Sequence, residues 1–303
     1  GGGGGGGGLV VYSCEDGSVR AVDPRTGGEA WVLRHEQRLG LLQSWVAGGG
    51  GAWLAAGSST GHVALWDVRY SLRLSSWREP ARGRILSMAY ASQPAGSAAA
   101  GPLLLLGGAS GLTSGWVLGE AIPRPALVLQ PAGIPDAAAD AAAAPPLDAS
   151  SADAAGPPAP TDGSRGVRAL LSSCDGSSML TASTDMAVRC WRPRLPAGGH
   201  NCITLGGGAD GAAQPSASAR VLPSGALVLA EAASPDGGGA SEADGGGTAT
   251  PLPSSHTPAG EAGPLGGGSG ECHAAITALV YCATQQPGLL IAGSLDGIVH
   301  VWR

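Results

Sequence analysis

Residues 290–302, LIAGSLDGIVHVW, decide the fold of this chain. They consist of an apolar run, a two-residue turn at Asp296-Gly297, and a run that alternates apolar and polar residues before it ends in Trp302. Asp-Gly between two such runs is a strong signal for a β-hairpin, because both central residues of the turn need a positive φ angle. The sequence therefore predicts an antiparallel hairpin here.

The same pattern occurs four more times, with Val22 in place of the Trp in the first copy. Asp185 lies six residues before Trp191, as Asp296 lies six residues before Trp302. The five copies are residues 10–23, 55–67, 105–116, 180–191 and 290–302. Five matches in one register indicate an internal repeat.

The spacing of the copies predicts the fold class. Gly17 and Gly61 are 44 residues apart, and Gly61 and Gly111 are 50 apart, close to the ~40–45 residues of a WD40 repeat. In that repeat four antiparallel strands make one blade of a β-propeller. Inner strands are predicted at residues 41–46, 85–90, 167–171 and 276–281, and outer strands at 29–33, 72–77, 126–130 and 202–205. We expect an all-β WD40 propeller with about five recognisable four-stranded blades, incomplete at the N-terminus.

Composition divides the chain between blades and low-complexity tracts. Gly (53 residues) and Pro (23 residues) make up about a quarter of the 303 residues. Two stretches lack the large apolar side chains that offset chain entropy, and we expect them to be disordered. The predicted order is a Gly tract (1–8), three blades (9–130), a disordered insertion (131–164), one blade (165–205), a second disordered insertion (206–270) and a last blade without its outer strand (271–303). Within the second insertion, residues 220–230 are a candidate for a small isolated hairpin.

Several classes of function are excluded by what the sequence lacks. All 17 basic residues are Arg, so the chain has no Lys for a phosphate-binding loop, a protein kinase site or a Schiff base. A net charge of −6 gives no electrostatic signature of nucleic-acid binding. No apolar run reaches the ~18 residues of a membrane span, and no secretory signal is visible. The six Cys form no C-x-x-C pair and are expected to be reduced thiols. No cofactor is expected.

Polar residues of the repeat are the candidate structural site. In the last blade His273, Ser294, Asp296 and Trp302 occupy the positions of a hydrogen-bonded tetrad that locks WD blades, because a buried Trp N–H needs an acceptor and a buried Asp or His needs a partner. The other residues assigned to such sites are Ser183, Asp185 and Trp191 in the fourth blade, which has no obvious His, and Trp66 and Asp67 in the second.

Two chemical alternatives remain beside this structural interpretation. His273 and Asp296 could form a catalytic dyad with a Ser nucleophile, although the repeat already explains their spacing. Cys190, His200, Cys202 and the adjacent Cys272 and His273 could ligate a metal, but no two of them lie at zinc-finger spacing. We therefore expect neither a catalytic residue nor a metal ligand.

One cluster of charge stands out. Five arginines fall within 16 residues on and after the outer strand of the second blade: Arg69, Arg73, Arg78, Arg82 and Arg84. They are either a solvated rim of the propeller or a surface that meets an acidic partner or an anionic membrane.

Residues 57–70, GSSTGHVALWDVRY, are more particular than a general WD repeat. Together with residues 29–35 (EAWVLRH), 180–191 (LTASTDMAVRCW) and the ending 293–303 (GSLDGIVHVWR), they resemble the C-terminal propeller of the Vps15-type regulatory subunit of the class III phosphatidylinositol 3-kinase complex. The resemblance covers most of the blade residues in collinear order and is weak at residues 102–130.

The resemblance implies a non-catalytic scaffold. In that family a kinase-like domain and helical repeats precede a seven-bladed propeller, so this chain looks like the C-terminal portion of a longer protein. The family holds the lipid kinase catalytic subunit and a Beclin-type coiled-coil subunit at membranes for autophagy and for endosomal and vacuolar sorting. The implied location is cytoplasmic and peripheral to those membranes through the complex. The alternative is an unrelated WD-repeat adaptor, such as a ubiquitin-ligase substrate receptor or a trafficking coat subunit.

Overall fold

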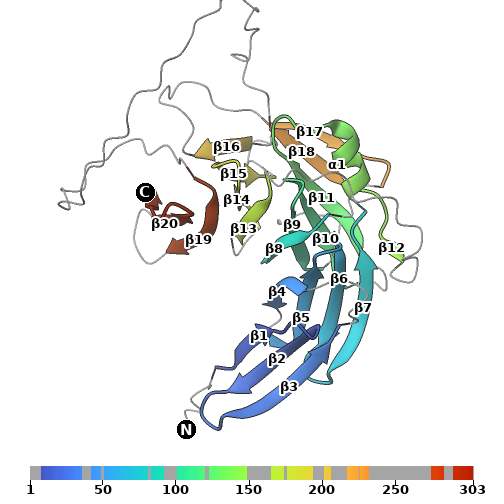
Figure 1. The fold of residues 1–303 in the computed structure, drawn as a ribbon. Helices are drawn as coiled ribbons and strands as arrows, with labels where there is room; N and C mark the ends of the chain where they lie inside the picture. Colours follow the sequence, from blue (N-terminus) through green and yellow to red (C-terminus); the bar gives the residue numbers. More distant parts are fainter. Residues whose placement is uncertain are drawn as a thin grey trace, which may run out of the picture.

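The described residues form five β-sheets in the computed structural model. The structure describes residues 8–35, 42–48, 51–80, 83–91, 101–119, 123–148, 165–173, 176–193, 201–205, 217–224, 226–231, 274–282 and 289–302. Figure 1 shows the sheets arranged along an open arc, with β1 to β3 at one end and β19 to β21 at the other.

Each sheet contains one of the five predicted hairpins. The first consists of β1 (Val10–Ser13), β2 (Ser18–Asp23) and β3 (Gly28–Arg34). The second consists of β4 (Leu42–Gly48), β5 (Trp53–Ser58), β6 (His62–Asp67), β7 (Leu72–Arg78) and β12 (Leu147–Asp148). The third consists of β8 (Ile85–Ala91), β9 (Leu103–Gly108), β10 (Thr113–Val117), β11 (Arg124–Gln130), β18 (Leu227–Glu231) and β17 (Ala217–Val221). The fourth consists of β13 (Val167–Ser172), β14 (Met179–Ser183), β15 (Val188–Arg192) and β16 (Asn201–Leu205), and the fifth of β19 (Ile276–Cys282), β20 (Leu289–Ser294) and β21 (Val299–Trp302).

Apolar clusters fill the spaces between consecutive sheets. Trp66 belongs to the cluster shared with the first sheet, Trp116 to the one shared with the second, and Trp191 to the one shared with the third. Trp116 lies against Trp77 of the preceding sheet, with ring centroids 5.9 Å apart. The third strand of a blade thus packs its Trp onto the blade before it, where one side chain buries roughly 150–250 Å². This packing explains why the repeat keeps a Trp at that position.

The predicted strands are confirmed. The second, third and fourth sheets place the expected inner and outer strands on either side of the hairpin, and the first and last sheets each show three strands among the described residues. Apart from one parallel pair in the third sheet, the strands pair antiparallel, which agrees with the predicted all-β propeller class. Among the described residues no strand pairing joins the first sheet to the last.

The prediction that residues 131–164 are disordered is wrong for the first half of that stretch. It forms helix α1 (Asp136–Ala142) and strand β12, which pairs with β7 as a fifth strand of the second sheet. The composition argument failed because it counted large apolar side chains. Here Ala139, Ala142 and Ala143 are buried against Val128, where small side chains let the helix approach the sheet closely.

The prediction for residues 206–270 needs a similar correction. The candidate hairpin exists as β17 and β18, but it is not isolated, because β18 pairs with β11 in parallel. The third blade therefore has six strands instead of four. Short-range sequence signals cannot reveal a pairing between strands that are a hundred residues apart.

Candidate functional site

The five hairpin turns share one backbone conformation. Gly17, Gly61, Gly111 and Gly297 have φ angles of 78°, 81°, 86° and 82°. Met186 occupies the corresponding position in the fourth blade with φ 67°. The turn therefore imposes left-handed backbone even on a residue that carries a side chain.

Met186→Gly is expected to raise the free energy of unfolding by about 1 kcal/mol, because Gly adopts left-handed backbone without strain. The Met186 side chain is 43% exposed, so its loss removes little burial. Gly297→Met is the reciprocal variant, since a Cβ at Gly297 meets no heavy atom within 4 Å. It should destabilise the chain by about 1 kcal/mol through the backbone alone. Chemical denaturation of both variants tests this, and equal signs for the two changes would contradict it.

Side-chain oxygens complete the same turns. In the fourth blade Asp185 accepts the N–H of Ala187 at 3.2 Å and the hydroxyl of Ser183. In the fifth, Asp296 accepts the N–H of Ile298 at 3.1 Å and the hydroxyl of Ser294. The hydrogen bond from Ser294 lowers the pKa of Asp296. These four predicted site residues are therefore brought together in pairs, as turn caps.

The indole of Trp191 has a different partner from the one the sequence indicated. Its Nε1 donates to Oγ1 of Thr181 at 3.0 Å, not to Ser183. Thr181 and Ser183 lie two residues apart on β14 and so share a face of the sheet. The Thr181 hydroxyl accepts from the indole, while the Ser183 hydroxyl donates to Asp185 of the turn. The hydroxyl partner of the Trp in this blade is therefore Thr181 instead of Ser183.

The remaining tetrad residues are placed as follows. Trp66 is buried and lies edge-on to His35, with ring centroids 6.5 Å apart. The backbone of Trp302 pairs with Leu290, but its side chain lies outside the described residues, as does the whole of His273. In the fifth blade Nε2 of His300 lies 3.5 Å from the Ser294 hydroxyl.

Sequence reasoning missed two residues that connect successive blades. The N–H of His35 donates to the carbonyl of Gly17, and the N–H of Glu79 donates to that of Gly61, each at 2.8 Å. Both residues follow an outer strand, 18 residues after the turn glycine, and both side chains reach the next blade. Counting from the turn glycines could have found them.

Glu79 closes a buried polar chain between the second and third blades. The indole of Trp116 donates to Oγ of Ser114 at 3.0 Å, and that hydroxyl donates to Oε1 of Glu79 at 3.0 Å. Burial raises the pKa of Glu79 to about 7, although the hydrogen bond from Ser114 opposes the rise. Glu79 is thus a carboxyl that titrates near neutral pH inside the fold.

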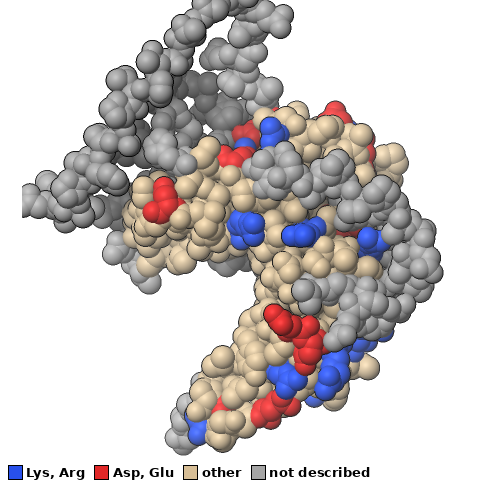
Figure 2. Space-filling view, in the orientation of Figure 1, with Lys and Arg blue, Asp and Glu red and all other residues tan. Residues whose placement is uncertain are grey.

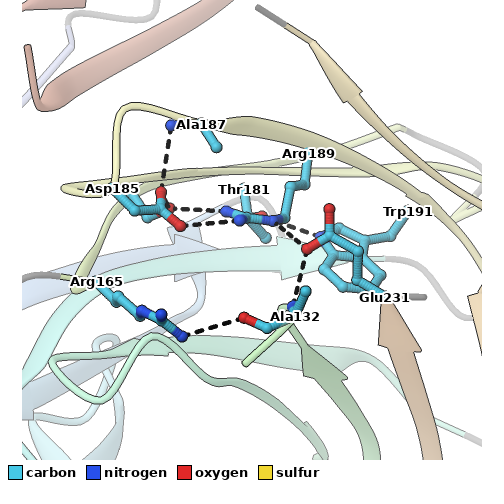
Figure 3. Close-up of polar contacts among 9 residues, drawn as sticks. Ala132, Arg165, Thr181, Asp185, Ala187, Arg189, Trp191 and Glu231 are labelled. Carbon is cyan, nitrogen blue, oxygen red and sulfur yellow. Dashed lines mark hydrogen bonds and ion pairs between the residues drawn. The ribbon is translucent and has the colours of Figure 1, made fainter. Parts of the chain in front are cut away.

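A second buried polar network joins the fourth blade to the inserted hairpin (Figure 3). The guanidinium of Arg189 contacts Asp185 through Nη2 and Glu231 of β18 through Nε, both at 2.8 Å. Oε2 of Glu231 also accepts the N–H of Ala132 at 2.9 Å. Burial disfavours the charged form of Arg189, but the hydrogen bonds and charges of Asp185 and Glu231 together outweigh it, so its pKa is raised.

One member of the predicted arginine surface, Arg69, belongs to a turn. Arg69 forms a two-pronged contact with Asp67, through Nε at 3.1 Å and Nη2 at 2.6 Å, and the pair Arg25 and Asp23 repeats this geometry in the first blade. The hydrogen bond from Arg69 lowers the pKa of Asp67. Arg69 and Asp67 therefore stabilise a turn.

The other described arginines of this cluster are Arg73, Arg78 and Arg84. Nε of Arg78 donates to the carbonyl of Thr60 at 3.2 Å, at the opposite end of β7. Arg73 and Arg84 are exposed, and Arg82 lies outside the described residues. On the face drawn in Figure 2, basic and acidic side chains near the N-terminal end of the arc lie side by side. They do not form a surface of one sign there.

The described thiols and candidate ligands show no assembled metal centre. Among the described residues Cys14, Cys190, Cys202 and Cys282 form no disulfide, and burial raises the pKa of Cys190 and Cys202. In the part of the chain that the structure describes, no three His, Cys, Asp or Glu side chains are grouped so that they could hold a metal ion. His200, Cys272 and His273 fall outside that part. None of the helices seen there is long and apolar enough to cross a membrane.

Fold and turn geometry together define the class: these sheets are WD-repeat blades of the β-propeller type. Residues 159–192, which include the fourth hairpin, match the family model "WD40: WD domain, G-beta repeat". A chain in a crystal structure of the mitotic checkpoint complex has a similar fold, with a TM-score of 0.53 over 97% of this chain and 58% of that one. Its sequence identity is 14%, so the likeness concerns the fold alone.

Within this class the chain is similar to VPS15 proteins. It is 33% identical over 72 residues to "Serine/threonine-protein kinase VPS15" of Arabidopsis thaliana and 33% identical over 81 residues to "Probable serine/threonine-protein kinase vps15" of Dictyostelium discoideum. These segments cover 24% and 27% of this chain and only 5% and 4% of the relatives. "WD repeat-containing protein 81" of Danio rerio is 39% identical over 75 residues, which is 22% of this chain and 3% of that protein. The resemblance to Vps15-type subunits is confirmed for part of the WD-repeat region.

Proposed function

We propose that this chain is a non-catalytic WD-repeat scaffold within a Vps15-type regulatory subunit of the class III phosphatidylinositol 3-kinase complex. The observation that carries the proposal is the similarity to two VPS15 proteins in a chain that folds into WD-repeat blades. In this proposal its partners are the lipid kinase catalytic subunit and a Beclin-type coiled-coil subunit. Its role is to support autophagy and endosomal and vacuolar sorting from a cytoplasmic position, peripheral to those membranes through the complex.

Contacts between successive blades support a scaffold role. Polar chains such as Trp116–Ser114–Glu79 join one blade to the next, and apolar clusters fill the space between them. Surfaces on such a framework keep a fixed relation to one another, and a binding platform benefits from this because little conformational freedom is lost on association.

The test is recovery of partners from native cells. The natural protein that contains this chain would be affinity-purified and its partners identified by mass spectrometry. We expect a phosphatidylinositol 3-kinase catalytic subunit together with a Beclin-type coiled-coil protein. Recovery of a cullin adaptor or of coat subunits instead would overturn the proposal.

A second candidate is an unrelated WD-repeat adaptor, such as a ubiquitin-ligase substrate receptor or a trafficking coat subunit. The similarity to WD repeat-containing protein 81, with 39% sequence identity over 75 residues, supports this second candidate. The same purification distinguishes the two candidates, because each predicts a different set of partners.

Charge reversal at the exposed arginines is expected to weaken the partner contact. Arg73→Glu combined with Arg84→Glu should lower recovery of the catalytic subunit about tenfold, since exposed Arg residues are frequent energetic centres of interfaces. Arg168→Glu, a reversal at an exposed position of β13, is the matched control and should leave recovery unchanged. Equal recovery with all three proteins would show that the arginine cluster is only a solvated rim.

A further inference from the structure

The hairpin β17–β18 is an unusual component of the third blade. It belongs to the sequence between the fourth and fifth blades, yet it pairs with β11 of the third. The pairing is parallel, with Leu227, Val228, Leu229 and Ala230 opposite Leu127 to Gln130. The outer strand of that blade therefore has an edge that accepts a further strand.

Two neighbouring side chains of β18 point in opposite directions and enter different apolar clusters. Val228 is fully buried in a cluster with Leu112, Val128 and the alanines of α1. Leu229 is fully buried in the cluster between the third and fourth blades, which includes Trp191. Successive residues of a strand face opposite sides of the sheet, so this pair occupies two separate apolar sites.

A carboxylate site lies two residues further along. Oε2 of Glu231 accepts from Nε of Arg189 at 2.8 Å and from the N–H of Ala132 at 2.9 Å (Figure 3). Arg189 and Glu231 are 9% and 10% exposed, so the contact is largely shielded from water. Charge-assisted hydrogen bonds of this kind are about twice as strong as neutral ones and select for an acidic residue.

Contacts outside the hairpin hold Arg189 and the edge of β11 in place. When Glu231 leaves, Arg189 keeps its ion pair with Asp185 and its hydrogen bond to Ser183. The guanidinium is therefore held in place by its own blade. The four strands β8 to β11 also form a complete blade without β17 and β18.

We propose that the edge of β11, together with Arg189 and the Ala132 N–H, is a strand-addition site for an extended peptide that carries two adjacent aliphatic residues and an acidic residue two positions later. In this structure the chain fills the site with its own residues Val228, Leu229 and Glu231. Because the hairpin and the site belong to one chain, docking is intramolecular, with an effective concentration in the millimolar range. A partner segment of the same pattern reaches the site only in competition with the hairpin. The proposal does not depend on the identity of the complex proposed above.

The first test is hydrogen exchange on the intact chain. The amides of residues 217–231 are expected to exchange at least tenfold faster than those of β9 and β10, because a docked hairpin opens without unfolding of the blade. Exchange of both regions at the same rate would mean that the hairpin opens only with the whole fold, which would overturn the proposal.

The second test adds the ligand in trans. A synthetic peptide of residues 217–231 with a fluorophore at its N-terminus is titrated into the unaltered chain and into Leu229→Asp, whose own hairpin cannot dock. Fluorescence anisotropy should show binding to the variant at least tenfold tighter than to the unaltered chain. Val221→Asp, at a position that is 71% exposed on the hairpin, is the matched control and should behave like the unaltered chain.

The same titration tests the carboxylate. The peptide with Glu231→Gln should bind the Leu229→Asp chain about tenfold more weakly, and the peptide with Leu229→Asp should not bind at all. Equal binding of the Glu and Gln peptides would refute recognition of an acidic residue. Two results would show that the hairpin is an integral part of the core. One is failure of the peptide to bind the Leu229→Asp chain, and the other is loss of the β-sheet circular dichroism signal of that chain.

Discussion

We expect Glu79 to lower the free energy of unfolding by about 3 kcal/mol as pH rises from 4.5 to 8, and we expect Glu79→Gln to abolish this decrease. The physical reason is that the fold buries this carboxyl at 4% exposure and raises its pKa to about 7, while its ordinary pKa is 4.5. Gln retains an oxygen that accepts from Ser114 but never ionises. The free energy of unfolding of the variant should therefore lack the pH-dependent part that Glu79 causes.

The direction follows from proton binding in the two states. Below about pH 4.5 Glu79 is protonated in both the folded and the unfolded chain, and its ionisation contributes nothing. Between about pH 4.5 and 7 the folded chain keeps a proton that the unfolded chain has released, so the free energy of unfolding falls as pH rises. Above about pH 7 both states are ionised and the penalty is constant.

The measurement is denaturant unfolding, followed by Trp fluorescence, at several pH values from 4.5 to 8. The quantity of interest is the difference between Glu79→Gln and the unaltered chain, which cancels the other titrating groups. Glu15→Gln, at an exposed position of the first blade, is the matched control and should change the free energy of unfolding by less than about 0.5 kcal/mol. A constant difference for Glu79→Gln would mean that its carboxyl titrates normally.

The blades could be predicted from the sequence because their signals are local. The turn at Gly17, Gly61, Gly111 and Gly297 requires a positive φ, and an alternating strand follows each of these glycines. A Trp comes five residues after the turn glycine in the last three of these copies. Spacing between these turns then indicated the repeat. The fourth copy, with Met186 in place of Gly, could still be recognised from its Asp and Trp, although its strain became visible only in the backbone.

The parts that could not be predicted depend on distant contacts. Thr181 and Ser183 are equally plausible partners of Trp191 in sequence, and only the geometry of the sheet chooses between them. Glu79 reads as an ordinary charged residue after a strand, since its burial is created by the next blade. The pairing of β18 with β11 joins residues a hundred positions apart, and the alternation of apolar and polar residues within a strand does not indicate which distant strand it pairs with.

Arg189→Met is expected to lower the free energy of unfolding by about 3–5 kcal/mol, because it leaves buried carboxylates without their cation. Arg189 is 9% exposed and contacts two acidic residues, Asp185 from its own turn and Glu231 from the inserted hairpin. Met has a similar length and fills the space, so the loss reports charge rather than volume. Arg168→Met, at an exposed position of β13 in the same blade, should change stability by less than about 0.5 kcal/mol.

A double-mutant cycle separates the two acidic partners. Glu231→Gln alone should cost about 1–3 kcal/mol, because it loses a charge-assisted hydrogen bond while Arg189 keeps Asp185. If Arg189 acts mainly through the hairpin, adding Glu231→Gln to Arg189→Met should recover at least 1 kcal/mol, since the orphaned carboxylate is then gone. If it acts mainly within its own turn, the two losses should add, and the hairpin would be held chiefly by its apolar residues. Equal stability of Arg189→Met and the unaltered chain would mean that these charges are solvated, in contradiction to the burial of the network.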